Sequence, residues 1–332
     1  MGTSSEHAGL IALVRRLAQP LTPQPVPPEA GGAARLGPLA GIRGVLFDVY
    51  GTLLVSAAGE IGHGGSVVAK RAAMGAALDD AGLAHDPRTP AAAALVHDLE
   101  AAIRVTHATA IGNGVAHPEV DLRVIWRRLL PAASATAAAR AIVSYECRSN
   151  PVWPMPGAAR VIAALQARGP VGVVSNAQFL TPLVLAALLP QVSFDPKLVV
   201  WSFVQREAKP SARLFAHAAE RMARHHGHRP EQLLMVGNDL RNDILAARRA
   251  GLRGALFAGD ARSLRLRRDD PACSGLQPEL VLTELPQLPA ALGAVGLRQP
   301  PEDRTGRTKG AASGDGFGAP LGRRAASPRR AR

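Results

Sequence analysis

Short apolar runs alternate with longer stretches of helical periodicity along most of this 332-residue chain. Runs this short and continuous are typical of strands that are covered on both faces. They predict strands at 44–49, 171–174, 198–202, 233–236, 254–258 and 279–283. Between them, apolar residues at helical spacing predict helices at 156–168, 179–189, 211–225 and 242–250. This alternation predicts the α/β class, with a doubly wound parallel sheet and helices on both of its faces.

One interval breaks the alternation. Between Leu54 and Pro151 the pattern contains helix signals and no good strand. We expect four helices there, at about 66–83, 90–110, 118–130 and 134–148. The division that follows is an α/β core at 44–55 and 151–297, interrupted by an all-helical cap at 56–150. Because the interval follows the first strand directly, the cap is expected to stand over the carboxyl end of that strand and to exclude water.

The two ends of the chain differ from this middle part. Residues 1–43 predict a short amphipathic helix, Ala8–Ala18, followed by a proline-rich linker. Residues 298–332 carry nine Arg or Lys and three Asp or Glu, so this tail holds +6 of the net charge of +13. It is poor in apolar residues, and we expect it to be disordered.

Charge and composition also limit the partners. A net charge of +13 suggests nucleic acid, but much of it lies in a tail with almost no aromatic residues for base stacking. We therefore expect no nucleic-acid partner beyond nonspecific contact by the tail. No apolar run is long enough to span a bilayer, so we expect no membrane partner. The two cysteines form no CxxC pair, which favours a reducing compartment, and we place the protein in the cytoplasm.

Two strands end in polar residues that suggest chemistry. The apolar run 44–47 ends in Asp48, and a glycine turn with Thr52 follows. A buried parallel strand ends in this way when it delivers a nucleophile to its carboxyl edge. The run 171–174 ends in Ser175 and Asn176, whose hydroxyl and backbone amide can bind an anionic group. This second signal is weak alone, because many strands end in Ser-Asn for reasons of turn geometry.

Two further stretches supply charges that could act with Asp48. Lys209 precedes Pro210 at the start of a predicted helix, where it would balance the charge of Asp48 and of an anionic substrate. The alternative is an exposed lysine before a helix-starting proline. The run 233–236 leads to Asp239 and Asp243, which are four residues apart and would share one helix face. With Asp48 they could chelate Mg²⁺, although Asp239 could instead cap the helix.

In this order, the four stretches resemble the haloacid dehalogenase superfamily of hydrolases, over about residues 44–285. The family pattern is a nucleophilic Asp, then Ser or Thr, then Lys, then an acidic motif. Asp48, Ser175, Lys209 and Asp243 fall on these positions, and Thr52 matches the threonine after the glycine turn. The resemblance implies the HAD-like Rossmannoid core, and the long helical interval looks like the cap of the family.

Most members are Mg²⁺-dependent phosphatases, and the resemblance implies hydrolysis of a small anionic phosphate monoester through an aspartyl-phosphate. We expect the catalytic and substrate-binding residues to be Asp48, Tyr50, Thr52, Lys209, Ser175 and Asn176. We expect the Mg²⁺ ligands to be Asp48, Tyr50, Asp239 and Asp243. Two positions depart from the phosphatase pattern. Tyr50 stands where the family has its acid/base Asp, and Asn238 replaces the Asp that normally follows Gly237. A tyrosine is a poor base near neutral pH, so we expect a slow phosphatase or one limited to good leaving groups.

Two alternatives remain open at this point. Tyr50 resembles the 2-haloacid dehalogenases, which need no metal and release halide without protonating it. Against this, Phe215 stands where they carry Tyr, and Leu240 stands where they carry Asn. Arg71 and Arg104 are unsupported candidates for binding a haloacid carboxylate. The second alternative is a noncatalytic binding protein on a degraded fold of this family. The basic stretch Arg262, Arg265, Arg267 and Arg268 could meet an anionic substrate or partner, but it is interpreted as a solvated loop.

Overall fold

The computed structural model describes residues 4–58 and 66–293. Its main feature is a six-stranded parallel sheet in the order β5-β4-β1-β6-β7-β8. The strands are β1 Gly44–Phe47, β4 Val171–Ser175, β5 Val199–Trp201, β6 Leu233–Gly237, β7 Arg253–Phe257 and β8 Leu280–Leu282. The predicted α/β class and all six predicted strands are therefore confirmed, with boundaries that shift by one or two residues.

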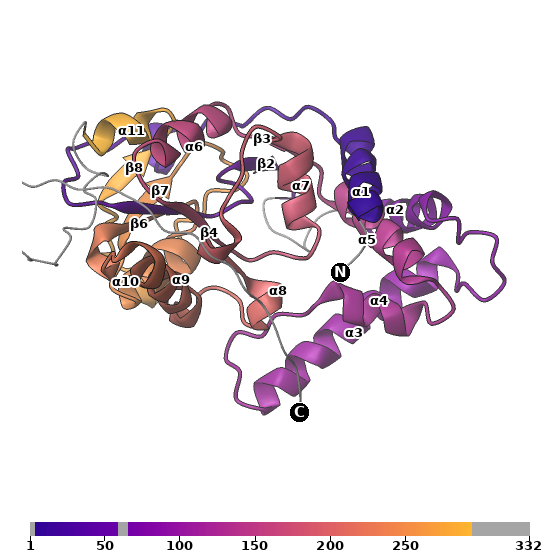
Figure 1. Ribbon diagram of the computed structural model, residues 1–332. Coiled ribbons are helices and arrows are strands. Elements are labelled where there is room, and N and C mark those ends of the chain that lie inside the picture. Colours follow the sequence, from indigo (N-terminus) through magenta and orange to yellow (C-terminus); the bar gives the residue numbers. More distant parts are fainter. Residues whose placement is uncertain (1–3, 59–65, 294–332) are drawn as a thin grey trace, which may run out of the picture. The chain divides into compact units, whose positions relative to one another are not determined.

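Alternate side chains of β1, β4 and β6 enter two separate apolar clusters, which is why these runs are continuously apolar. Val45 and Phe47 of β1 point into one cluster, while Leu46 points into the other. Figure 1 shows α9 and α10 on one side of the sheet and α6 and α11 on the other. These core helices are α6 Ala158–Gln166, α7 Thr181–Leu188, α8 Ser202–Gln205, α9 Ala212–His226, α10 Ala246–Arg249 and α11 Gln287–Ala291.

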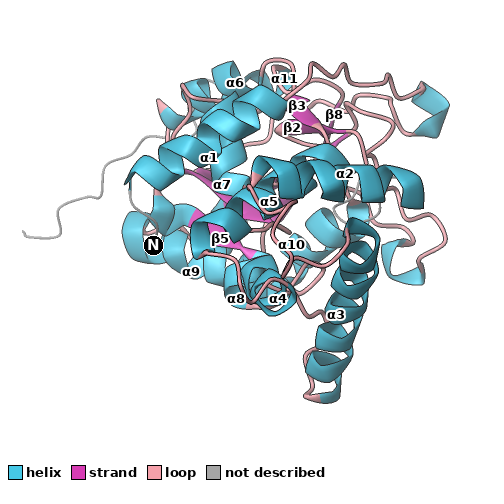
Figure 2. Ribbon diagram, turned by 90° about the vertical axis from the view of Figure 1, so that its right-hand side faces the viewer, coloured by secondary structure: helices cyan, strands magenta, loops and turns pink. Residues whose placement is uncertain are grey.

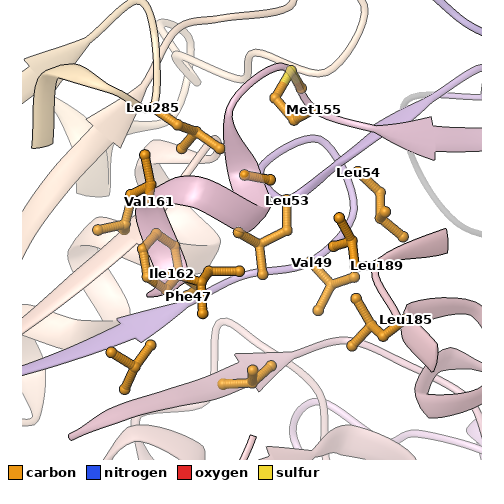
Figure 3. Packing of buried hydrophobic residues seen from close by; sticks show 14 of the residues in the cluster. Phe47, Val49, Leu53, Leu54, Met155, Val161, Ile162, Leu185, Leu189 and Leu285 are labelled. Atoms are coloured by element: carbon orange, nitrogen blue, oxygen red, sulfur yellow. The ribbon is translucent and has the colours of Figure 1, made fainter. Parts of the chain in front are cut away.

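The larger cluster surrounds the turn that follows β1. Figure 3 shows Phe47, Val49 and Leu53 packed against Val161 and Ile162 of α6. Each of these five side chains is at most 2% exposed. Burial on this scale stabilises the fold by about 1.5–3 kcal/mol for each large apolar side chain. The apolar core therefore holds the turn that carries Asp48 in place.

A small antiparallel pair, β2 Leu54–Ser56 and β3 Val152–Pro154, joins this core to the helical interval. The sequence did not predict it, because three-residue strands have no measurable alternation. Between β2 and β3 the described residues 66–149 hold α2 Val67–Asp80, α3 Ala92–Gly112, α4 Leu122–Leu129 and α5 Ala135–Ser149. We call them the helical insertion. They enclose an apolar cluster of their own around Met74, Leu95 and Trp126, and α2 packs along α5 (Figure 2).

The N-terminal segment lies against the core. Helix α1 Ser4–Leu17 buries Leu10, Leu13 and Val14 in the main cluster and contacts α5 and α7. The proline-rich stretch contains a 3₁₀ turn, Pro28–Ala30, and the isolated bridge between Arg35 and Val281 places it beside β8. Further 3₁₀ turns are Pro196–Leu198, Pro230–Gln232 and Pro271–Cys273. None of the helices in the described part of the chain is long and apolar enough to cross a membrane. The predicted tail, 298–332, lies outside the described residues.

The predicted helix 242–250 is divided in the structure. A π-helical turn, Leu240–Leu245, precedes α10. Asp239 accepts hydrogen bonds from the backbone N–H groups of Arg241 and Asn242 at 2.9 and 3.0 Å, and it thereby caps this turn. π-Helical turns occur often at functional sites, and the periodicity of the sequence does not predict them.

Candidate active site

The candidate site lies at the carboxyl edge of the sheet, where β1 runs between β4 and β6. Asp48 follows β1 directly, and its backbone N–H donates to the carbonyl of Val236 at 2.9 Å. Ser175 ends β4, and Asn238 follows β6. Because the ends of parallel strands meet at one edge, residues far apart in sequence are brought together there. The structure thus assembles three of the four stretches by topology alone.

Lys209 forms ion pairs with Asp48, which follows β1, and with Asp243, which lies in the turn after β6. Its ammonium nitrogen lies 2.6 Å from Oδ1 of Asp48 and 2.6 Å from Oδ1 of Asp243. Asn176 orients the lysine, since its Oδ1 accepts from the Lys209 backbone N–H at 2.8 Å. The lysine side chain is only 4% exposed, so the alternative of an exposed lysine before a proline is wrong. Burial alone would lower the pKa of Lys209, but the charges of Asp243 and Asp48 outweigh it and raise that pKa.

Asp243 is also held by the backbone. Its Oδ2 accepts from the N–H of Asp239 at 3.0 Å. A Cβ at Gly237 would lie 2.3 Å from the Asp243 carboxylate carbon, so only glycine allows this close approach. Burial raises the pKa of Asp243, against the attraction of Lys209, and the charges of Asp48 and Asp239 raise it further. Two buried carboxylates around one ammonium leave one negative charge without a partner when all three groups are ionised.

Asp239 has different partners from those that the sequence suggested. One oxygen caps the π-helical turn, and Oδ2 lies 2.5 Å from a guanidinium nitrogen of Arg267. Within the described ranges, no three His, Cys, Asp or Glu side chains form a group that could hold a metal ion. The alternative role of Asp239 as a helix cap is the one seen. The four expected ligands, Asp48, Tyr50, Asp239 and Asp243, all line one cavity, and metal binding by them stays a prediction.

The hydroxyl of Tyr50 lies 3.0 Å from Thr181 Oγ1 at the start of α7. Burial raises the pKa of Tyr50 above its ordinary value, although the hydrogen bond with Thr181 opposes the shift. A phenol held in this way stays protonated at physiological pH. It cannot act as the general base that the family places at this position.

Thr52 is fully buried and donates from its hydroxyl to Asn238 Oδ1 at 3.0 Å. Asn238 in turn donates through Nδ2 to the carbonyl of Ser263 at 2.6 Å. Both ends of this amide are thus committed, and Thr52 links the turn after β1 to the loop after β6. Gly51 makes the turn possible, because its φ is +83° and a Cβ there would lie 2.6 Å from Ser263.

A cavity of about 350 Å³ opens above Asp48 and Lys209. Residues of the core and of the helical insertion share its wall. The lining residues are Asp48, Tyr50, His107, Pro118, Glu119, Asn176, Ala177, Gln178, Ala208, Lys209, Asn238, Asp239, Asn242, Asp243, Arg265 and Arg267. Ser175 is fully buried and is not part of this wall, and its hydroxyl donates to the carbonyl of Asn176.

Several wall residues were not expected from the sequence. Arg265 and Arg267 belong to the stretch interpreted as a solvated loop, and both are half-buried and line this cavity. The candidates Arg71 and Arg104 are exposed and lie outside the cavity. His107 and Glu119 come from the helical insertion. No local pattern could have singled them out, because their role depends on where the insertion meets the core.

The comparison with protein families agrees with the geometry. The model of the haloacid dehalogenase-like hydrolases matches residues 42–251. This range contains Asp48, Ser175, Lys209 and Asp243 in the order of the family pattern. The protein is thus an enzyme of the hydrolase class, and the chain belongs to the haloacid dehalogenase-like hydrolase family.

Solved structures with related folds include two kinds of enzyme. A 2-haloacid dehalogenase from Pseudomonas syringae pv. Tomato is 19% identical over 76% of this chain and 98% of its own, with a TM-score of 0.49. A HAD phosphatase from Thermococcus onnurineus is 17% identical over 78% of this chain and 100% of its own, with a TM-score of 0.46. No curated protein sequence matches this chain. These similarities are too distant to assign a reaction.

Proposed function

We propose that this hydrolase cleaves small phosphate monoesters, with Asp48 as the nucleophile and an aspartyl-phosphate as the intermediate. The observation that carries the proposal is the Asp48–Lys209–Asp243 group. It buries two carboxylates around one ammonium and leaves a negative charge that a bound cation would offset.

The donor set fits Mg²⁺ with fewer protein ligands than the sequence suggested. Mg²⁺ commonly binds through one or two carboxylates, together with waters and substrate phosphate. Asp48 and Asp243 would hold it. Asp239 is committed to its cap and to Arg267, and the phenol of Tyr50 is committed to Thr181. Bound there, Mg²⁺ would neutralise charge on the transferring phosphoryl group.

The protein groups have separate tasks in this reaction. A carboxylate oxygen of Asp48 forms a bond to phosphorus while the bond to the leaving oxygen breaks, and water then hydrolyses the acyl phosphate. The ammonium of Lys209 offsets the repulsion between the two anions. Arg265 and Arg267 add positive charge to the wall, which favours an anionic substrate.

The helical insertion would act as the cap of this site. It supplies His107, Pro118 and Glu119 to the wall, so a substrate must fit between it and the core. A cavity of about 350 Å³ lies at the small end of ligand pockets, which favours a small molecule. Two backbone hydrogen bonds tie the insertion to the loop before Lys209, from Ala208 N–H to His117 at 2.7 Å and from Glu119 N–H to Arg206 at 3.1 Å.

Dehalogenation of a 2-haloacid is the second candidate, and Tyr50 favours it. Halide leaves without protonation, so a reaction of this kind tolerates a tyrosine that cannot exchange its proton. Phe215 argues against this candidate, because the fully buried side chain packs in the core cluster beneath β1 and β4 and cannot reach the cavity.

One paired assay tests both candidates. Phosphate release from a panel of monoesters is measured with and without Mg²⁺, and halide release is measured from 2-haloacids. Asp48→Asn is the test variant, and Asp98→Asn, on the exposed face of α3, is the matched control. We expect Mg²⁺-dependent phosphate release that Asp48→Asn abolishes and Asp98→Asn retains. Metal-independent halide release lost in Asp48→Asn would establish the alternative, and phosphate release that survives Asp48→Asn would contradict the proposed nucleophile.

A further inference from the structure

Glu119 is a carboxyl group in the cavity wall that the proposed reaction has not yet used. It lies between α3 and α4, and the helical insertion carries it to the core. Its backbone N–H donates to Arg206, and the neighbouring His117 carbonyl accepts from Ala208, the residue before Lys209. The position of Glu119 is therefore fixed relative to the lysine that holds Asp48.

Three donors fix the carboxylate itself. Oε2 accepts from Ser202 Oγ at 2.8 Å, and Oε1 accepts from Gln178 Nε2 at 3.2 Å and from the Val120 N–H at 2.9 Å. Ser202 Oγ also accepts from the N–H of Ala177 at 2.9 Å, and Ala177 follows Asn176 in the cavity wall. A side chain held by this many groups is positioned as a proton-transferring group must be.

The environment of Glu119 suits an acid that works near neutral pH. Burial raises its pKa to about 7, although the hydrogen bonds from Ser202 and Val120 and the charge of Arg206 oppose the shift. Arg206 is itself paired with Asp121 at 3.3 Å. The other titratable side chains of the shared wall are Asp48, Tyr50, His107, Lys209, Asp239, Asp243, Arg265 and Arg267. A carboxyl of this kind is partly protonated at pH 7, when ordinary glutamates are fully ionised.

We propose that Glu119 is the general acid and base of this hydrolase, in place of the family aspartate whose position Tyr50 occupies. As a bond forms between Asp48 and phosphorus, the bond from phosphorus to the leaving oxygen breaks and the Glu119 proton passes to that oxygen. The Glu119 carboxylate then accepts a proton from the water that attacks the aspartyl-phosphate, and phosphate leaves. The inference rests on the proposed phosphatase function and adds the residue that this function lacks.

His107 is the competing group in the same wall. Its Nε2 is buried without a hydrogen-bond partner among the described residues, and burial lowers its pKa. A ring nitrogen that nothing orients is less suited to proton transfer than a carboxyl held by three donors. The His107→Gln variant therefore serves as the rival in the test.

The test varies the leaving group. Alkyl phosphates need a protonated leaving oxygen, whereas p-nitrophenyl phosphate releases a stable phenolate. We expect Glu119→Gln to lower kcat/KM for alkyl phosphates on the order of 10²–10⁴-fold and to change it little for p-nitrophenyl phosphate. Glu119→Asp should recover part of the loss. Glu220→Gln, on the exposed face of α9, is the matched control and should behave as wild type.

Two further readouts separate catalysis from a structural effect. With p-nitrophenyl phosphate, Glu119→Gln should give a burst and accumulate phosphorylated protein, detected as the mass of one phosphoryl group, because water attack lacks its base. The ratio of wild-type to Glu119→Gln kcat/KM on alkyl phosphates should fall as pH rises above about 7, where the acid loses its proton. Taking the ratio removes the ionisation of the substrate.

The outcomes are distinct. An equal loss on both substrate classes, or no loss on either, would overturn the role of Glu119 while leaving the phosphatase function intact. A leaving-group dependence that appears in His107→Gln, and not in Glu119→Gln, would move the role to His107. Wild-type protein that releases no phosphate from any ester would remove the proposed function and this inference with it.

Discussion

The ammonium nitrogen of Lys209 lies 2.6 Å from Oδ1 of Asp48, and neither side chain is more than 9% exposed. An ion pair this deep is sensitive to the loss of either member, since the remaining charge is then buried without compensation. Here the loss of the lysine would expose two carboxylates to each other, because Asp243 shares the same ammonium. The group to which we assign the chemistry is thus also a determinant of stability.

Lys209→Met should therefore destabilise the protein by about 3–5 kcal/mol and abolish hydrolysis. Urea unfolding at pH 7 measures the first effect. The control is Lys70→Met, whose lysine pairs with Glu100 on the surface of the helical insertion and should contribute under about 1 kcal/mol. Adding Asp243→Asn to Lys209→Met should restore part of the stability. A double variant less stable than Lys209→Met would contradict the buried-charge argument.

Tyr50→Phe should leave hydrolysis within about threefold of wild type, since the phenol is held by Thr181 and transfers no proton. Removal of that hydrogen bond should cost about 0.5–1.5 kcal/mol of the free energy of unfolding. Steady-state kinetics and thermal unfolding of the same preparation measure both. A hundredfold loss of kcat with unchanged stability would instead show that Tyr50 takes part in the chemistry.

Asn238→Asp places a carboxylate where most members of the family have one. The new group can still accept from Thr52, but it would face the carbonyl of Ser263, to which the amide now donates at 2.6 Å. We expect a loss of about 1–3 kcal/mol in stability together with tighter Mg²⁺ binding, because a third carboxylate adds charge to the site. Calorimetric titration with Mg²⁺ tests the second part. Unchanged affinity would show that position 238 does not reach the cation.

Arg267→Gln should weaken the binding of anions, since this guanidinium lines the cavity and keeps Asp239 neutralised. We expect the Kd for inorganic phosphate to rise about tenfold, which corresponds to about 1.4 kcal/mol. Arg104→Gln, an exposed position outside the cavity, is the matched control. An equal rise of the phosphate Kd in both variants would indicate that the net charge of the protein, and not contact with Arg267, governs anion binding.

Two half-buried glutamates, Glu119 and Glu146, give stability a defined pH dependence. Burial raises the pKa of Glu119 and of Glu146 from 4.5 to about 7. Between these values the folded protein retains protons that the unfolded chain has released, so stability falls as pH rises through this window. Each group contributes a slope of at most about 1.4 kcal/mol per pH unit. The free energy of unfolding of Glu119→Gln and Glu146→Gln, measured across this range, should fall less steeply than that of wild type. Identical slopes would mean that neither carboxyl is protonated when folded.

Local pattern was enough to predict the strands and the positions of Asp48, Ser175, Lys209 and Asp243. The reason is that continuous apolar runs define buried parallel strands, and such strands end at a common edge. Asp48 and Asp243 lie near each other because β1 and β6 are neighbours in the sheet, and local pattern did not predict that strand order. The same logic placed the helical insertion after β1, although its joining pair β2 and β3 was too short to be recognised.

The partners of each side chain were decided only by tertiary structure. Asp239 satisfies backbone N–H groups and Arg267, Tyr50 reaches Thr181, and Thr52 reaches Asn238. These choices depend on loops that return from distant parts of the chain, and no spacing encodes them. Glu119 is the clearest case. In the sequence it is one carboxylate in a long helical interval. It becomes a candidate acid only because the insertion folds onto the loop before Lys209. This contact shields the carboxyl group from water and raises its pKa.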